Sequence, residues 1–525
     1  MPTFKLDGKE IPFEPGDTII RAAWKVGIEI PHYCWHPGLS SPANCRMCLV
    51  ETKPAEGQRA LMLDVVELDS ATGQYKSIKK PKLLPACQQP AVEGADILSD
   101  SSGHVTEARK YVQEALLLNH PVDCPICDQA GECKLQDYWL TQSGEKKRMR
   151  DEPIHKPKAV SFGDTIVYDG ERCVMCTRCV RFMDEVAKDP VLDMRERGNF
   201  NEIFVAPGRK LEGNYTMMTD HVCPVGALTT KDFRFKARVW FLKSSDSICQ
   251  GCATGCNAHL DVDPRKNTAH RYRPRDNESV NKFWMCDTGM ISYTRAHDGR
   301  IVQGRITGRE TIVSDALGEA AKELHAVPGS SIAVLLSAQH SVEDNWALLA
   351  FAKALSTSNV FWAGNVDGKA DDILISSDKN PNTTGVRQLA PKAANFHELV
   401  AAVRARSFTH VISLGSEVQS PDLASELGHA TLIAISAHEG PLSRAARVVL
   451  PATSWAEAQG TFVNGKGMAQ VSMRALNAQG ASRPAWKLVG MLMNACGHKP
   501  SWDKLQDIHT TLWPSDARPA EQLSV

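Results

Sequence analysis

Cysteine residues are concentrated in the first half of this chain and have the clearest potential for chemistry. The sequence has 525 residues and 16 cysteines, of which all but Cys496 lie between Cys34 and Cys286. Clustered cysteines in a reducing compartment are metal ligands or redox groups more often than disulfides, because thiols there are kept reduced. Their spacing divides them into four groups, each with three or four cysteines at short intervals.

The first group has one C-x2-C pair, with gaps of ten and 38 residues on either side of it: Cys34, Cys45, Cys48 and Cys87. Plant-type ferredoxins also use four cysteines, but with C-x4-C-x2-C spacing before the distant fourth. Upstream, Asp7-Gly8 predicts a β-hairpin, and Asp17 is expected to cap a short helix that runs through Trp24 to a left-handed stop at Gly27. A hairpin, a helix and a cysteine loop are typical of a β-grasp ferredoxin, so we predict a 2Fe-2S site. Zinc is the alternative, although zinc sites favour two close C-x2-C pairs.

The second group has three cysteines and a histidine, in the order His120, Cys124, Cys127 and Cys133. It follows a segment, 106–118, whose periodic apolar positions predict a helix. Three cysteines without a fourth nearby make His120 the candidate fourth ligand of a 4Fe-4S cluster. A neutral imidazole in place of a thiolate removes one negative charge and should raise the reduction potential. Two alternatives stay open: His120 merely ends the helix, or the four residues bind zinc.

The third group is the most specific pattern in the chain: Cys173, Cys176 and Cys179, closed by Cys223 before Pro224. Three cysteines at this pitch are typical of the loops with which bacterial ferredoxins bind a 4Fe-4S cluster. In two-cluster ferredoxins, the cysteine before proline binds the second cluster and not the one bound by the three cysteines that precede it. Because a second such triple is lacking in this sequence, we predict that Cys223 closes the same site.

The fourth group is ambiguous between zinc and a 4Fe-4S cluster when taken alone: Cys249, Cys252, Cys256 and Cys286. Its position after three stronger groups favours iron and sulfide. The four groups together use fifteen cysteines and His120, which leaves Cys496 as a buried apolar residue.

The order and type of these groups resemble the large iron–sulphur subunit of bacterial NADH:quinone oxidoreductase, respiratory complex I, in the family that also includes the mitochondrial 75-kDa subunit. The resemblance covers residues 1 to about 310. It implies one 2Fe-2S cluster and three 4Fe-4S clusters that carry electrons from the flavin of a partner subunit toward quinone. In this family the fourth cluster usually stands off the main route, and its segment 283–289 is similar to the N-terminal cluster domain of molybdenum enzymes.

Residues from about 311 onward alternate strand-like and helix-like segments. Strands are expected at 331–336, 409–415 and 431–435, with a helix at 342–355, so a parallel α/β sheet is predicted. Segments 447–457 and 460–467 resemble the molybdopterin-oxidoreductase fold. Proteins with a working molybdenum site are longer, and no cysteine lies between Cys286 and Cys496. We therefore expect a shortened scaffold without molybdopterin, in which Gly460, Gly465 and Gly467 are tight-turn residues.

These patterns predict a multidomain protein of α+β and α/β class with five domains. They are a β-grasp ferredoxin domain at 1–90, a His/Cys3 domain at 91–145, a ferredoxin-like domain at 146–240, a molybdopterin-oxidoreductase-type 4Fe-4S domain at 241–310 and the shortened α/β domain at 311–525. A net charge of -1 gives no reason to expect nucleic acid as a partner. No apolar run approaches the length of about 18 residues that a membrane span needs. The resemblance to the complex I subunit implies a peripheral protein on the cytoplasmic side of the bacterial inner membrane, as part of a membrane-bound complex.

Nucleotide-binding and protease motifs are lacking from the sequence, including G-x-G-x-x-G after a strand and H-E-x-x-H. We therefore expect no catalytic site and no flavin in this chain, and a partner subunit that binds NADH and flavin. One alternative is the electron-relay module of a soluble NAD-linked formate dehydrogenase or hydrogenase. Another is a zinc-stabilised scaffold with no redox role.

Overall fold

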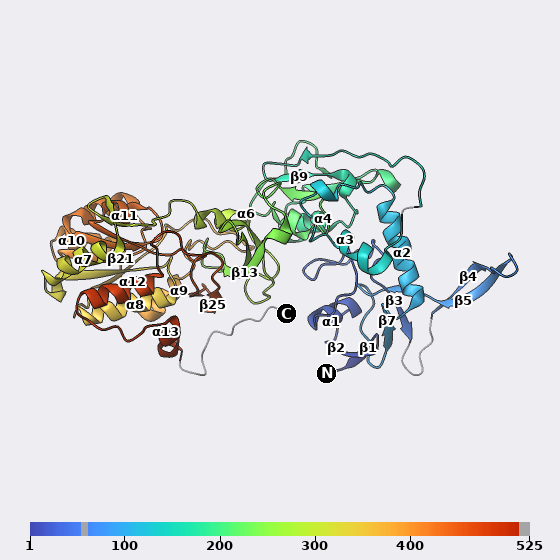
Figure 1. Ribbon diagram of the computed structural model, residues 1–525. Helices are drawn as coiled ribbons and strands as arrows, with labels where there is room; N and C mark the ends of the chain where they lie inside the picture. The colour runs from blue at the N-terminus through green and yellow to red at the C-terminus, as the bar shows by residue number, and fades with distance from the viewer. Residues whose placement is uncertain (54–60, 147, 514–525) are drawn as a thin grey trace. The chain divides into compact units, whose positions relative to one another are not determined.

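The computed structural model describes residues 1–53, 61–146 and 148–513. Parts of three predicted domain ranges, at 54–60, 147 and 514–525, lie outside the described residues. The described residues form two compact units, 1–240 and 241–513 (Figure 1).

The first unit begins with a five-stranded sheet in the order β2-β1-β7-β3-β6. The predicted hairpin is confirmed, because β1 and β2 pair antiparallel across Asp7 and Gly8, whose φ values of 48° and 84° are those of a tight left-handed turn. Apolar residues of the hairpin and helix α1 form one buried core with Cys48 and Cys87. The strands are β1 Thr3–Leu6, β2 Lys9–Pro12, β3 Leu49–Lys53, β6 Leu84–Pro85 and β7 Asp96–Leu98.

Helix α1, Ile19–Lys25, lies where a short helix was predicted, but Asp17 does not cap it. Thr18 occupies the cap position without a side-chain hydrogen bond. The Asp17 carboxylate instead accepts from the backbone N–H of Glu14 and pairs with Lys25 Nζ at 2.9 Å. The sequence predicted the cap one residue too early, because the Asp17 carboxylate accepts from the backbone N–H of the preceding Glu14 and not from a backbone N–H of the helix. The left-handed stop at Gly27 is confirmed, with a φ of 74°.

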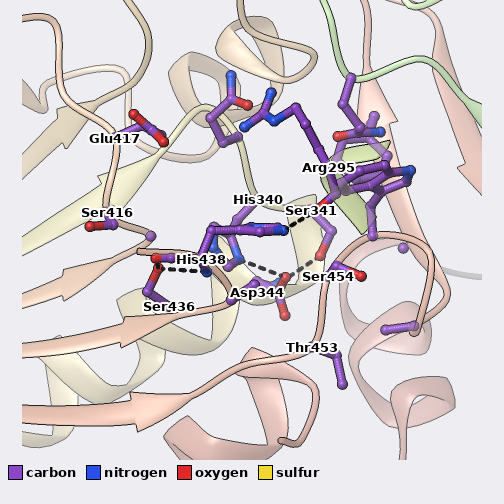
Figure 2. A pocket seen from close by; sticks show the side chains of 18 of the residues that line it. Arg295, His340, Ser341, Asp344, Ser416, Glu417, Ser436, His438, Thr453 and Ser454 are labelled. Atoms are coloured by element: carbon purple, nitrogen blue, oxygen red, sulfur yellow. Dashed lines mark hydrogen bonds and ion pairs between the residues drawn. The ribbon is translucent and has the colours of Figure 1, made fainter. Parts of the chain in front are cut away.

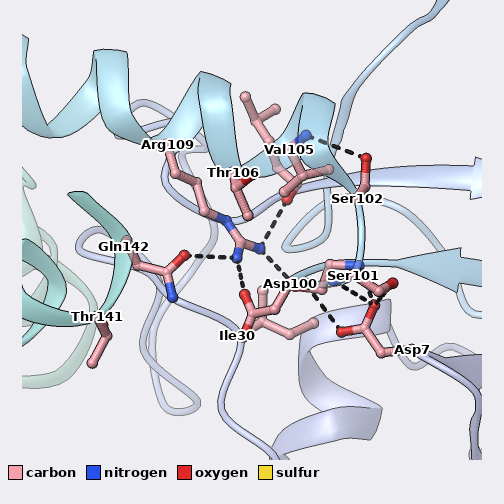
Figure 3. Close-up of polar contacts among 12 residues, drawn as sticks. Asp7, Ile30, Asp100, Ser101, Ser102, Val105, Thr106, Arg109, Thr141 and Gln142 are labelled. Atoms are coloured by element: carbon pink, nitrogen blue, oxygen red, sulfur yellow. Dashed lines mark hydrogen bonds and ion pairs between the residues drawn. The ribbon is translucent and has the colours of Figure 1, made fainter. Parts of the chain in front are cut away.

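Helix α2, Gly103–Leu117, confirms the predicted helix before the second cysteine group. Its Arg109 side chain is fully buried and donates to Leu49 O at 3.1 Å, Ser99 Oγ at 2.6 Å and Gln142 Oε1 at 3.1 Å, and it pairs with Asp100 (Figure 3). One guanidinium therefore joins the β-grasp sheet, helix α2 and the segment that follows α3.

A two-stranded ribbon lies within the long segment between Cys48 and Cys87. Strands β4 Met62–Leu68 and β5 Tyr75–Pro81 pair antiparallel and extend away from the five-stranded sheet (Figure 1). The 38 residues between Cys48 and Cys87 thus include an ordered pair of strands.

The remainder of the first unit consists of short elements around the second and third cysteine groups. Two small sheets are formed, one in the order β12-β9-β8 and one by β10 with β11. The elements are α3 Lys134–Tyr138, β8 Val160–Ser161, β9 Ile166–Tyr168, α4 Arg178–Arg181, β10 Leu192–Arg195, β11 Glu202–Val205, α5 Met218–Val222 and β12 Leu228–Thr230.

The second unit contains an eight-stranded sheet in the order β17-β16-β23-β22-β21-β18-β19-β20. The predicted parallel sheet is confirmed, since β18 pairs parallel with β19 and β21, and β21 pairs parallel with β22. Its strands are β16 Gly304–Ile306, β17 Arg309–Thr311, β18 Ile332–Ser337, β19 Val360–Ala363, β20 Ala394–Asn395, β21 His410–Leu414, β22 Thr431–Ser436 and β23 Val448–Pro451.

Helices cover both faces of this sheet. Successive side chains of its central strands point to opposite faces, so each face buries one alternate set of these side chains. Ile332 and Val334 of β18 pack with α7, α8 and α12, whereas Ala333 and Leu335 pack with α10 and α11. Cys496 lies in the first of these cores, as predicted. The helices are α7 Val313–His325, α8 Val342–Ala354, α9 Thr383–Leu389, α10 Phe396–Arg404, α11 Pro441–Ala445, α12 Ala485–Ala495 and α13 Leu505–Leu512.

A three-stranded sheet in the order β13-β14-β15 precedes the large sheet and carries the fourth cysteine group. Its members and neighbours are β13 Lys243–Ile248, β14 Asn257–Asp263, β15 Thr268–Pro274, α6 Asp287–Ile291, β24 Gly460–Val463 and β25 Ala469–Ser472. Among the residues described, none of the helices combines the length and apolar character needed to cross a bilayer.

Candidate metal centres

The four cysteines of the first group meet in two pairs. Cys34 Sγ and Cys45 Sγ lie 3.4 Å apart, and the side chain of Cys87 lies close enough to that of Cys48 to raise the pKa of the Cys48 thiol. Cys87 follows β6, whereas the other three belong to the loop between α1 and β3. In that loop Arg46 has a φ of 58°, a left-handed conformation that turns the backbone sharply between Cys45 and Cys48.

The four residues of the second group line one cavity of about 570 Å³: His120, Cys124, Cys127 and Cys133. Helix α2 ends at Leu117, three residues before His120, so this histidine is not the end of the helix. Cys133 opens α3 at its N-cap position. The predicted fourth ligand therefore faces the same space as the three thiols.

The four cysteines of the third group line a single, largely apolar cavity: Cys173, Cys176, Cys179 and Cys223. Met175 and Thr177, between the first three, have φ values of 52° and 60°. These alternating left-handed residues coil the backbone so that successive cysteines point inward. Cys223, which follows α5, is brought back to this cavity rather than to another group.

The fourth group lies on the turn between β13 and β14 and at the start of α6. Cys249 N donates to Cys256 O at 2.9 Å, which closes the turn that holds Cys252. Cys286 is the N-cap of α6, and a Cβ placed on Gly289 would lie 3.2 Å from Cys249 Sγ and 3.3 Å from Cys286 Sγ. Residues 249 and 286 are thus neighbours in space.

In residues 1–53, 61–146 and 148–513, no three His, Cys, Asp or Glu side chains converge on the position of a single metal ion. Backbone amides nonetheless point at the sulfurs of the third and fourth groups. Met175 N lies 3.4 Å from Cys173 Sγ, Gly251 N lies 3.4 Å from Cys249 Sγ and Gly289 N lies 3.3 Å from Cys286 Sγ. Such donors favour thiolate over thiol and tune the potential of a bound cluster.

Burial sets the protonation state of these groups before any metal binds. It raises the pKa of several thiols to about 11 or 12, as for Cys133, Cys173, Cys249 and Cys286. Burial, assisted by the charge of Arg172, lowers the pKa of His120 to about 4. The imidazole is therefore neutral and ready to bind a metal at pH 7, whereas the thiols must release protons on binding.

The second and third groups lie against each other, which the spacing of the cysteines did not indicate. Lys134 N, directly after Cys133, donates to Pro224 O at 3.0 Å, directly after Cys223. Arg172 pairs with Asp123 at 2.8 Å, and each of these residues immediately precedes the first cysteine of its own group. These contacts join residues about 50 to 100 positions apart, so no local signal could have revealed them.

The carboxyl ends of four parallel strands surround a cavity of about 70 Å³ in the second unit (Figure 2). His340 follows β18, Glu417 follows β21, His438 follows β22 and Ser454 follows β23. The chain reverses its direction of strand addition between β18 and β21, the point at which open α/β sheets bind ligands.

The predicted role of the three glycines in segment 460–467 is partly wrong. Gly460 is not a turn residue: it begins strand β24, and a Cβ there would lie 2.7 Å from Ser341 Cβ. Gly467 has a φ of 82° in the turn between β24 and β25, and Gly465 lies in the same turn. Close packing against the start of α8, rather than a turn, explains the absence of a side chain at position 460.

Four sequence families match consecutive parts of the chain. They are described as "2Fe-2S iron-sulfur cluster binding domain" at residues 1–102, "NADH-ubiquinone oxidoreductase-G iron-sulfur binding region" at 109–143, "NADH-quinone oxidoreductase subunit 3, ferredoxin-like domain" at 163–229 and "Molybdopterin oxidoreductase" at 316–495. The first three ranges contain the first three cysteine groups, in order. The fold class predicted from the sequence is therefore confirmed.

Known relatives of this chain are named as subunits of NADH-quinone oxidoreductase or as an iron–sulfur protein of mitochondrial NADH dehydrogenase. The chain is 33% identical over 373 residues to the G subunit of NADH-quinone oxidoreductase from Mycobacterium bovis, covering 69% of this chain and 43% of that protein. It is 34% identical over 368 residues to the mitochondrial NADH dehydrogenase [ubiquinone] iron-sulfur protein 1 of Solanum tuberosum, covering 69% and 46%. The chain thus spans less than half the length of these relatives.

Among solved structures, an NAD+-reducing NiFe hydrogenase in the H2-reduced state is 28% identical and covers 45% of this chain and 91% of that one. Its TM-score of 0.36 is too low to support an argument about fold or function. The matched domains, their order and the named relatives agree with the four cysteine groups. The chain belongs to the family of iron–sulphur proteins that includes the G subunit of NADH-quinone oxidoreductase.

Proposed function

We propose that this chain is an electron-transfer subunit of NADH:quinone oxidoreductase, with one 2Fe-2S cluster and three 4Fe-4S clusters. The observation that supports this most strongly is the gathering of each predicted ligand set on its own loops. When bound, such clusters accept and release single electrons, but they cannot accept a hydride. A partner subunit with flavin must therefore oxidise NADH.

The residues proposed to bind the clusters are those predicted from the sequence. They are Cys34, Cys45, Cys48 and Cys87 for the 2Fe-2S cluster, and, for the three 4Fe-4S clusters, His120 with Cys124, Cys127 and Cys133; Cys173, Cys176, Cys179 and Cys223; and Cys249, Cys252, Cys256 and Cys286. The neutral state of His120 and the amides directed at Cys173, Cys249 and Cys286 fit these roles.

The packing of the second site against the third supports electron exchange between them within one protein. The 4Fe-4S region at 241–310 and the α/β region at 311–525 are proposed as separate domains, as are the three ranges before them. We propose that the C-terminal domain does not bind molybdopterin, because no cysteine between Cys286 and Cys496 could supply a thiolate to molybdenum. We place the subunit on the cytoplasmic face of the inner membrane, held there by partner subunits.

Two other functions are distinguished by experiment. An electron-relay module of a formate dehydrogenase or hydrogenase would use the same clusters with a different partner, and the cited hydrogenase matches too weakly to favour it. A scaffold stabilised by zinc would contain zinc without sulfide.

The proposal is tested with the full chain purified without oxygen. NADH alone should leave its visible iron–sulphur absorbance unchanged, and addition of the flavin-containing subunit of a complex I should bleach that absorbance rapidly. Bleaching by NADH without the flavoprotein would contradict the proposal, as would the absence of bleaching when the flavoprotein is present and the clusters are intact.

A further inference from the structure

Two arginines on helix α4 reach from the third cysteine group to the first. Arg178 and Arg181 flank Cys179, and Arg178 is 7% exposed. In the sequence they are only basic residues beside cysteines, and nothing in the spacing assigns them a role. Most of their hydrogen bonds are donated to backbone carbonyl groups in or beside the two cysteine loops.

The guanidinium of Arg181 bridges ligands of two different sites. Its Nη2 donates to Cys34 O at 2.6 Å and to Cys176 O at 3.3 Å. Its Nη1 donates to Ser40 O, and its Nε donates to Thr177 Oγ1 at 3.2 Å. One planar group therefore fixes the backbone of a first-site cysteine relative to the backbone of a third-site cysteine.

Other contacts hold the same two loops together. Arg178 donates to Trp35 O on the first loop and to Val222 O, at 3.4 Å, beside Cys223. Asn44 Nδ2, beside Cys45, donates to Met175 O at 3.3 Å. The first and third sites are thus joined by hydrogen bonds to residues that bind, or adjoin those that bind, each cluster.

We propose that Arg181 is a positioning residue for electron exchange between the first and third sites. Its fork of donors fixes the separation of the two ligand loops, and its permanent positive charge favours the reduced state of both sites. The exchange moves one electron from the reduced site to the oxidised site, with no bond broken and no proton transferred. This inference rests on the proposed function, because it requires a cluster at each site.

Each reduced cluster carries one more negative charge, and cluster potentials depend on net charge and hydrogen bonding nearby. Arginine keeps its charge at any physiological pH, and the partly buried position of Arg181 reduces screening by solvent. Removing that charge should make reduction of both clusters less favourable.

The test uses the full chain with its clusters intact and three variants: R181Q, R181K and R209Q. R181Q removes the charge and the fork. R181K keeps the charge but replaces the planar fork with a single ammonium, which cannot hold both carbonyls in the same geometry. Arg209 pairs with Asp189 at the surface, so R209Q is the matched control for loss of one arginine charge.

Redox titration followed by EPR gives the midpoint potential of each cluster and the magnetic interaction between the two. R181Q should make the reduction of each cluster about tenfold less favourable in its equilibrium constant, which lowers each midpoint potential by about 59 mV for one electron. It should also weaken the magnetic interaction between the two clusters. R181K should keep the potentials near those of the unaltered chain and still weaken the interaction. R209Q should change neither.

Unaltered potentials and an unaltered interaction in R181Q, with both cluster signals present, would overturn the proposal. If R181Q fails to assemble a cluster, R181K decides: a magnetic interaction equal to that of R209Q would overturn the positioning role. Absence of both clusters from the unaltered chain would refute the proposed function instead, so the two failures are distinguishable.

Discussion

Substitution of Gly226 by alanine tests how closely the second and third sites are packed. Gly226 follows Cys223 by three residues and lines the cavity of the second site. Its backbone is not in the left-handed region, so alanine adds no conformational strain. The only effect of the substitution is the methyl group, which points at Cys127 Sγ.

The size of the disturbance follows from the distances. A Cβ at position 226 would lie closer than 3.0 Å to Cys127 Sγ and 3.1 Å from Gln129 Cβ, whereas ordinary contacts begin at 3.4 Å. The sulfur or the loop must therefore move by at least about 0.4 Å, twice the tolerance of about 0.2 Å on metal–ligand distances. A free thiol could rotate away at little cost, but a ligand held by iron cannot.

We expect G226A to lose or strongly alter one 4Fe-4S EPR signal, with a loss of stability of about 1 to 3 kcal/mol from overpacking. The 2Fe-2S signal should remain. The control is G251A, because a Cβ there would lie 3.5 Å from Cys249 Sγ, an ordinary contact. If G226A retained every signal of the dithionite-reduced protein at full intensity, Cys127 would not be a ligand held at this position.

Three further substitutions test other parts of the account. H120A should lose or alter one 4Fe-4S signal and spare the 2Fe-2S signal, and unchanged spectra would remove His120 from the ligand set. Burial would raise the pKa of Asp261, but hydrogen bonds and charge from Arg273 outweigh it and hold the pKa at about 2, below the 3.8 of the unfolded chain. This carboxylate therefore stabilises the fold above about pH 4, and roughly 2 to 3 kcal/mol of that stability is lost as the pH falls toward 2. Urea unfolding of D261N should show a correspondingly smaller dependence on acid pH, and an equal dependence would contradict this. E457Q should leave the buried Arg300 guanidinium without its carboxylate and lower the free energy of unfolding by about 3 to 5 kcal/mol in denaturant titrations, whereas a change below about 1 kcal/mol would show that the pair contributes little.

Local patterns predicted most of the elements that carry the sites. Asp7-Gly8 specified its hairpin because the turn conformation depends on those two residues alone. The buried strand β18 was readable because both of its faces are covered, which leaves an uninterrupted apolar run. The prediction that Asp17 caps helix α1 was wrong because several nearby donors compete for its carboxylate, and the sequence does not show which of them it binds.

The cysteines of each predicted group are close in sequence, and the structure brings Cys223 to the cavity of the third group and Cys286 beside Cys249. The grouping of these residues in space could therefore be predicted, whereas their role as cluster ligands stays a prediction. Relations between sites were not predictable. Arg181 reaches Cys34 across 147 positions, and Gly226 reaches Cys127 across 99. Such contacts depend on how whole loops pack, which no periodicity or spacing records.

Four separate sets of ligands are proposed to gather iron and sulfide. The most direct measurement is the iron, acid-labile sulfide and zinc content of the full chain purified without oxygen, combined with EPR after dithionite reduction. We predict iron and sulfide in the amounts of one 2Fe-2S and three 4Fe-4S clusters, with a separate signal for the 2Fe-2S cluster. A colourless protein that contains zinc, or no metal, and no sulfide would contradict the account.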